Sequence, residues 1–149
     1  MSYLEKLSFG HVVHINSFIL EVIPHQGIEI NDKCVEEYDH FIRERQQPVG
    51  ILFNRSYGFS YTFDALQKII ANPRIVAIAF LATERYAYTI TENDIALILD
   101  QHKPIDVFYD KLIATLWLNM LRTRLPHEHE LFSGKNHRIK SPRVFEKES

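Results

Sequence analysis

The chain has 149 residues, of which 46% are hydrophobic and 12% aromatic, enough apolar material for one well-filled core. Its formal net charge of −2 gives no global field toward nucleic acid or an anionic membrane, and its single cysteine, Cys34, excludes an internal disulfide and a cysteine-built zinc site. The first residues lack a signal-peptide core and no apolar run reaches about 18 residues, so we expect a soluble cytoplasmic protein without a membrane span.

The first part of the chain predicts a β-hairpin followed by a helix. Two β-rich apolar runs, residues 11–15 and 18–23, are joined by the turn pair Asn16-Ser17. Asn31 is a good N-cap, and the apolar residues after it recur at helical spacing to about Gln46. The inward face expected for this helix consists of Cys34, Val35, Tyr38, Phe41 and Ile42.

Two further apolar runs are typical of strands that are covered on both faces, and each precedes a helical pattern. Residues 49–54 predict the central strand and residues 75–82 a second fully apolar strand. Thr62 or Ser60 can cap the helix after the central strand, and Thr83 the helix after the second apolar strand. The expected inward faces are Phe63, Leu66, Ile69 and Ile70 in the first of these helices, and Ala87, Ile90, Ile95, Ile98 and Leu99 in the second.

The last predicted strand and helix precede a change in composition. Residues 105–109 predict a short strand, and Asp110 caps the helix after it. The face expected to be buried consists of Leu112, Ile113, Leu116, Trp117 and Met120 or Leu121. Few apolar residues follow Arg124, so we expect one domain over residues 1–124 and a C-terminal tail over residues 125–149 that could dock on the domain or on a second copy.

The predicted order is strand, strand, helix, and then three strand–helix pairs. Strands that alternate with helices after an initial hairpin are typical of the α/β class. We therefore expect a mostly parallel sheet of about five strands whose initial hairpin is antiparallel.

Several of these segments resemble a known family. The hairpin, the segments PVGILFN and NPRIVAIAFLA, and above all KPIDVFYDKLIATLWL look like the small STAS-like proteins of the SpoIIAA-like superfamily, over residues 3–121. The resemblance implies a STAS-like fold and a non-enzymatic switch or ligand-sensing role, with a kinase-like or signalling protein as partner. In such switch proteins a serine of an Asp-Ser-Ser-Gly motif starts the helix after the central strand. The motif is missing from NRSYGFSYTFDAL here, where Ser60 or Ser56 is only an approximate positional counterpart.

The loop after the central strand is the most distinctive local feature. It places Arg55, Tyr57, Phe59 and Tyr61 beside the C-terminal end of a strand and the start of a helix. Ligands of open α/β sheets bind at that edge, and a phosphate on Ser60 or Ser56 would be favoured by the helix dipole. The alternative is a loop whose aromatic residues pack on the core and whose hydroxyl only caps the helix.

Patterns typical of catalysis, metal binding or nucleic-acid recognition are weak. The eight histidines are scattered without metal-ligand spacing, and Cys34 lies on the apolar stripe of a predicted helix, where a thiol packs as a small hydrophobic group. No serine has the nucleophile-elbow motif, and the paired carboxylates belong to solvated helix faces. The basic segment KNHRIKSPR is typical of a solvated arm. We therefore predict no catalytic residue, metal or cofactor, and no specific nucleic-acid binding.

These observations favour a non-enzymatic regulatory module that binds a partner protein through Arg55, Tyr57, Phe59 and Tyr61 and the helix after them. Two alternatives stay open. One is a sensor that holds an apolar ligand between helices and sheet, which a lined cavity would favour. The other is a homodimer or larger homo-oligomer that uses the C-terminal tail.

Overall fold

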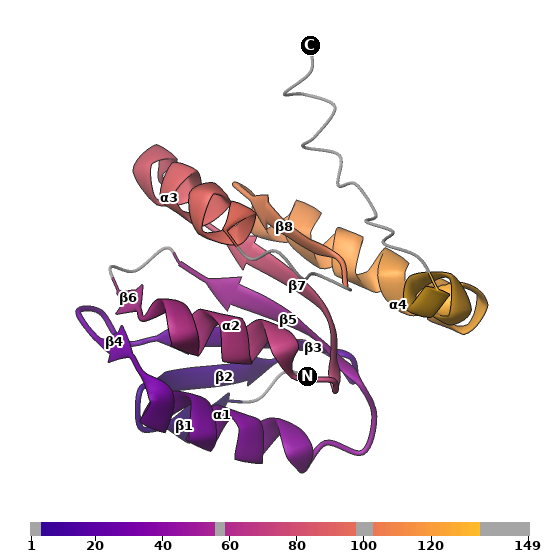
Figure 1. Ribbon diagram of the computed structural model, residues 1–149, viewed down its shortest axis with the longest axis horizontal. Coiled ribbons are helices and arrows are strands. Elements are labelled where there is room, and N and C mark those ends of the chain that lie inside the picture. The colour runs from indigo at the N-terminus through magenta and orange to yellow at the C-terminus, as the bar shows by residue number, and fades with distance from the viewer. Residues whose placement is uncertain (1–3, 56–58, 98–102, 135–149) are drawn as a thin grey trace.

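The main sheet of the computed structural model, which describes residues 4–55, 59–97 and 103–134, has six strands (Figure 1). Their order across the sheet is β1-β2-β3-β5-β7-β8. The first two pairings are antiparallel and the other three parallel, which confirms the predicted α/β class with an antiparallel hairpin at its start. The strands are β1 (Leu4–Leu7), β2 (Gly10–His14), β3 (Ile19–Pro24), β5 (Val49–Asn54), β7 (Ile75–Leu81) and β8 (Ile105–Phe108).

The sheet has one strand more than expected, because β1 pairs with the outer side of the predicted hairpin. Its sequence, LEKL, contains two charged residues in four positions, so hydrophobicity does not mark it as a strand. Charged side chains are common on edge strands, where they discourage pairing with other chains. By contrast, β5 lies between β3 and β7 and is buried along its whole length, as predicted for a central strand.

A second, two-stranded parallel sheet joins β4 (Glu29–Ile30) to β6 (Ser60–Tyr61). The sequence did not predict either strand, since each has only two residues. Backbone bonds from Ser60 N to Ile28 O and from Thr62 N to Ile30 O extend the pairing. The loop after β5 is therefore tied at its far end to the segment that leads into α1.

Three helices cover one face of the main sheet and a fourth covers the other (Figure 1). The first three are α1 (Asp32–Arg43), α2 (Phe63–Ala71) and α3 (Arg85–Ala96). Their apolar residues form the larger core with the facing sheet residues. The fourth helix, α4 (Lys111–Gly134), contributes the smaller core on the opposite face.

The helix boundaries confirm three predicted caps and correct a fourth; the third confirmed cap is Asp110, whose side chain accepts from Ile113 N at 3.1 Å at the start of α4. Asn31 caps α1, which ends at Arg43 rather than near Gln46, and Thr62, not Ser60, caps α2. Thr83 was wrong as a cap: α3 begins at Arg85 after Glu84, because the chain stays extended through Glu84 after leaving the sheet. Its buried residues are Tyr88, Thr91 and Ile95, whereas Ala87 and Ile90 are only partly buried and residues 98–102 lie outside the described ranges.

The last helix crosses the predicted domain boundary. It runs without a break from Lys111 through Arg124 to Gly134, and residues 135–149 lie outside the described part of the chain. The division into residues 1–124 and 125–149 therefore stays a prediction. Within the described ranges, no helix is both long and apolar enough to cross a bilayer.

Candidate functional site

The predicted binding loop is folded inward where the structure describes it. Phe59 is partly buried against the larger core, and its ring stacks on Phe53 at a centroid distance of 5.8 Å. Among the loop residues that the structure describes, Ser60 is the exposed one. Ser56 and Tyr57, the other two predicted site residues in this loop, lie outside the described residues.

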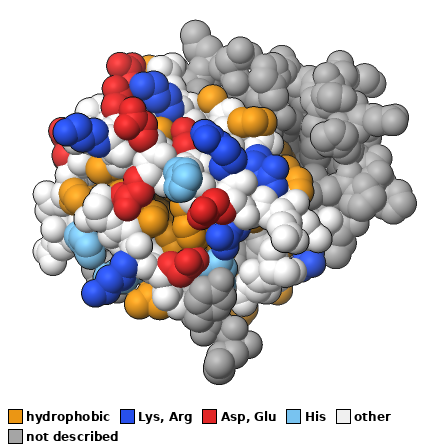
Figure 2. All heavy atoms as spheres, turned by 90° about the horizontal axis from the view of Figure 1, so that it is seen from below, with side chains coloured by type: hydrophobic (Ala, Val, Ile, Leu, Met, Phe, Trp, Pro, Cys, Tyr) orange, Lys and Arg blue, Asp and Glu red, His pale blue; other side chains and the backbone are white. Residues whose placement is uncertain are grey.

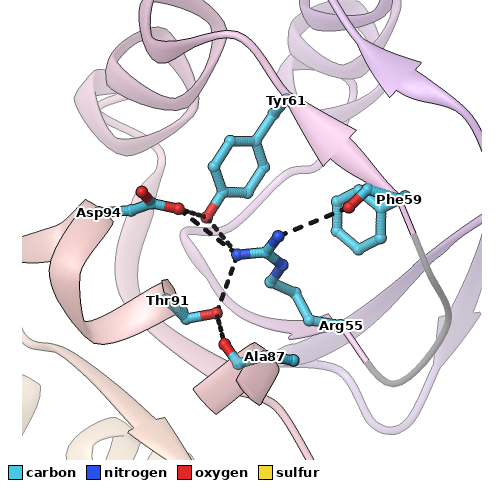
Figure 3. Close-up of polar contacts among 6 residues, drawn as sticks. All are labelled: Arg55, Phe59, Tyr61, Ala87, Thr91 and Asp94. Carbon is cyan, nitrogen blue, oxygen red and sulfur yellow. Dashed lines mark hydrogen bonds and ion pairs between the residues drawn. The ribbon is translucent and has the colours of Figure 1, made fainter. Parts of the chain in front are cut away.

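Arg55 connects this loop to α3 (Figure 3). Its Nη1 donates to Tyr61 Oη and to Thr91 Oγ1, each at 2.9 Å, and lies 3.5 Å from Asp94 Oδ2. Its guanidinium also lies over the rings of Tyr61 and Phe59, at 4.7 and 5.3 Å from their centroids. Only 10% of the Arg55 side chain is exposed, so these contacts occupy most of its surface.

Tyr61 completes the network between Arg55 and Asp94. Its hydroxyl accepts from Arg55 and donates to Asp94 Oδ2 at 2.9 Å. Burial raises the pKa of the Tyr61 phenol well above its ordinary range; Arg55 lowers this pKa and Asp94 raises it. The phenol therefore stays protonated and keeps its donor role at every physiological pH.

Three of the predicted loop residues are thus brought together, but as part of the fold. Arg55, Phe59 and Tyr61 contact one another and α3 rather than projecting as a free surface. The sequence analysis missed Thr91 and Asp94, which supply the α3 side of this network. The sequence pattern that could have identified them is a threonine and an acidic residue one turn apart on a helix with only a weak apolar stripe.

The α4 helix presents a continuous apolar face to solvent. The exposed fractions are 66% for Leu112, 43% for Ile113, 58% for Leu116 and 41% for Met120. Positions four apart lie one above the other on a helix, so these residues form a single strip, called here the α4 stripe. We predicted Leu112, Ile113 and Leu116 to be buried, and for these three residues the prediction was wrong; of the alternatives Met120 and Leu121, only Leu121 is buried.

A different set of α4 residues contacts the sheet. Ala114, Trp117, Leu118 and Leu121 are at most 2% exposed and recur at helical spacing. The prediction was therefore correct for Trp117 and for Leu121. The helix has two apolar strips, and side-chain periodicity alone does not say which of them faces the sheet.

Polar side chains fix which strip of α4 faces inward. Near the start of the helix, Lys111 Nζ lies 2.7 Å from Oε1 of the buried Glu21 on β3, whose other oxygen accepts from Asn54. Two turns on, Asn119 Oδ1 accepts from the Asn16 amide at 3.1 Å. Arg122 then donates to Ser17 Oγ at 2.9 Å. These contacts hold the α4 stripe outward.

Two open hollows lie near the N-terminal ends of β5 and β7, whereas the predicted loop follows the C-terminal end of β5. One has a volume of about 490 Å³ and is lined by Asp39, Arg43, Lys68, Ala71, Asn72, Pro73 and Arg74. The other, of about 360 Å³, is lined largely by polar residues of the β2–β3 turn and the segment after α1. Their linings carry charged and amide groups, which do not match the apolar ligand of the alternative hypothesis.

Charges of both signs are mixed on the surface. Figure 2, which shows the side of the molecule that carries α1, has Lys and Arg side chains interspersed with Asp and Glu. No group of three or more metal-ligating side chains occurs among the described residues. Cys34 is buried on α1, and the basic segment KNHRIKSPR falls outside the described residues.

Comparison with known proteins gives one structural likeness to report. No family model matches the chain, and no curated protein matches it. A crystal structure at 2.25 Å of an uncharacterised DUF3478 protein with a SpoIIAA-like fold, from Shewanella loihica PV-4, is similar with 10% identity and a TM-score of 0.42. The match covers 79% of this chain and 92% of that one. The description gives that protein's fold and no activity, so what this chain does is argued from its own residues.

Proposed function

We propose that this chain is a non-enzymatic protein-interaction module that binds another polypeptide through the α4 stripe. The observation that carries the proposal is the exposure of Leu112, Ile113, Leu116 and Met120 along one side of one helix. Single exposed apolar residues are normal on a protein surface, but a contiguous group of them marks an interaction site.

The fold does not need these four side chains. The opposite strip of α4 already fills the smaller core, and its members are almost fully buried. A helix that only covered a sheet would carry polar residues on its outer side. The stripe instead offers aliphatic residues with successive helical spacing, the pattern by which a helix packs against another chain.

The inward packing of the loop favours this surface over the one predicted from sequence. Partner-binding surfaces depend on side chains that are available to be buried on contact. The Arg55 guanidinium is engaged by Tyr61, Thr91 and Asp94, so a partner or a phosphate on Ser60 would have to displace those contacts. The α4 stripe instead offers exposed aliphatic side chains, which a partner can bury on contact.

The proposal is tested by co-purification of tagged full-length chain from its host cells. Leu112→Glu with Leu116→Glu places two charges in the stripe, and Leu97→Glu is the matched control, because Leu97 is 62% exposed at the C-cap of α3, away from α4. We expect the double variant to lose proteins, or copies of the chain itself, that the native chain and the control retain. Equal recovery from all three chains would contradict the proposal.

The same experiment tests the loop surface predicted from sequence. Ser60 is exposed in β6, and Phe63, 44% exposed at the start of α2, lies beside it in the chain. Ser60→Glu imitates a phosphate and Phe63→Glu disrupts an apolar contact. If these variants lose the partners and the α4 variants keep them, the binding surface is the loop and not the α4 stripe.

A further inference from the structure

We infer that the polypeptide that docks on the α4 stripe is a second copy of this chain, which presents its own stripe in return. This inference rests on the proposed function, since it names the occupant of the same surface. Most homo-oligomers are closed two-fold dimers in which both copies use one self-complementary patch. The α4 stripe has the properties that such a patch requires.

Over residues 111–122, whose side chains the structure describes, the stripe is apolar without interruption and its outer flank is uncharged. The residues beside it on that flank are Thr115 and Asn119, and both already have partners, in the carbonyl oxygen of Lys111 and the amide of Asn16. A surface without charges can meet a copy of itself without like-charge repulsion. Such an uncharged surface has no electrostatic complementarity for a strongly acidic or strongly basic partner.

Among the α4 side chains that the structure describes, those of residues 111–122, both cations point away from the stripe. Lys111 is paired with Glu21, and Arg122 donates to Ser17, so neither lies across the stripe. The whole chain has a formal net charge of only −2, so two copies repel each other weakly. These charges favour self-association over capture of a strongly acidic or basic segment.

The stripe also has a central residue about which two copies can pair. Leu112, Leu116 and Met120 occupy successive turns, and Leu116 is the middle one. In a two-fold pair centred on the stripe, Leu116 lies near the axis whether the helices run parallel or antiparallel. The two Leu116 side chains should therefore be close neighbours in the dimer.

The oligomeric state of the purified full-length chain is the first test. In sedimentation velocity at increasing concentration, we expect dimers of the native chain and of the Leu97→Glu control. We expect a monomer at every concentration for Leu112→Glu with Leu116→Glu. An unchanged circular dichroism spectrum and urea midpoint would show that this variant is folded, as expected for substitutions at exposed positions.

Cross-linking at the central residue is the second test, and it reports the contact itself. A cysteine in place of Leu116 should form a disulfide-linked dimer under mild oxidation, whereas a cysteine in place of Leu97 should not. The native thiol does not interfere, because Cys34 is buried. The bond requires Cα atoms within about 7 Å, so random collisions give little product.

The possible outcomes separate the inference from the proposed function. A native chain that stays monomeric, with no more cross-linking at Leu116 than at Leu97, overturns the inference. If co-purification then still depends on the α4 stripe, the occupant is a different protein and the proposed function stands. If co-purification does not depend on the stripe either, both fail.

Discussion

Replacement of Arg55 by methionine should cost the fold about 3 kcal/mol of unfolding free energy. Two bonds of 2.9 Å from its charged Nη1, to Tyr61 and Thr91, are lost at about 1.5 kcal/mol each. The pair with Asp94 adds little, because its atoms are 3.5 Å apart and Asp94 is 29% exposed. Methionine keeps most of the apolar contact with the Phe59 ring, so the loss reports mainly the polar network.

Urea unfolding followed by circular dichroism measures this loss. The control is Arg85→Met, which removes an exposed guanidinium at the start of α3 and should change stability by less than about 0.5 kcal/mol. A double-mutant cycle of Arg55→Met with Asp94→Asn should show coupling, because the two residues share the Tyr61 hydroxyl. A loss below 1 kcal/mol for Arg55→Met would refute the reasoning and return Arg55 to the list of residues available to a partner.

Three further predictions concern packing and pH. A Cβ at Gly10 would overlap the carbonyl oxygen of Ile23, so Gly10→Ala should lower the urea-unfolding free energy by about 2 kcal/mol; an unchanged midpoint would contradict the close approach. Leu118→Ala, at a fully buried site, should cost about 3 kcal/mol and Leu116→Ala less than about 1, whereas equal costs would mean that the α4 orientation is wrong. Burial lowers the pKa of Lys103 to about 8, so the unfolded chain binds more protons above that pH. Stability should then rise by up to about 2 kcal/mol between pH 8 and 10, and Lys103→Met should remove the rise. A native chain whose stability does not rise over this range would contradict the burial of the amine.

Much of the fold could be predicted from sequence because its central strands and first two helices are locally unambiguous. Residues 49–54 are apolar throughout, and the structure buries them all. Asn31 and Thr62 are good caps at helix starts, and both receive the expected backbone bonds. In these elements the pattern, the cap and the burial agree, except that Phe63 was predicted to face inward and is 44% exposed at the start of α2.

The elements that were missed are short, and their formation depends on partners distant in the sequence. The strand LEKL exists because β2 offers it an edge, and β4 and β6 have two residues each. Neither case leaves a periodic signal over a window long enough to detect. Burial of such segments is decided by tertiary pairing, which a single sequence does not show.

The orientation of α4 illustrates a different limit. The helix carries two apolar strips, and the larger side chains of Leu112, Ile113 and Leu116 predict the wrong one. The inward strip instead uses the small Ala114 and is selected by polar contacts such as Lys111 with Glu21. Because Glu21 lies 90 positions earlier, in an otherwise apolar strand, spacing within the helix could not reveal the choice.

The candidate site was only partly predictable for a related reason. Aromatic residues and an arginine in a loop at the edge of a parallel sheet predict binding, and the same residue types also form internal networks. The position of Asp94, 39 residues beyond Arg55 in the chain, decides whether Arg55 belongs to a binding surface or to an internal network. The α4 stripe could be identified only from the structure, which shows which residues of α4 are buried and which are exposed.

The most direct test of the central claim is photo-cross-linking at the α4 stripe in the host cells. Benzoylphenylalanine in place of Leu116 should form a discrete covalent adduct with a polypeptide, and an adduct of twice the chain mass would identify a second copy. The same group in place of Leu97, which is similarly exposed at the C-cap of α3, should give no such adduct. If Leu116 yields no adduct beyond that at Leu97, the α4 stripe is not a docking surface.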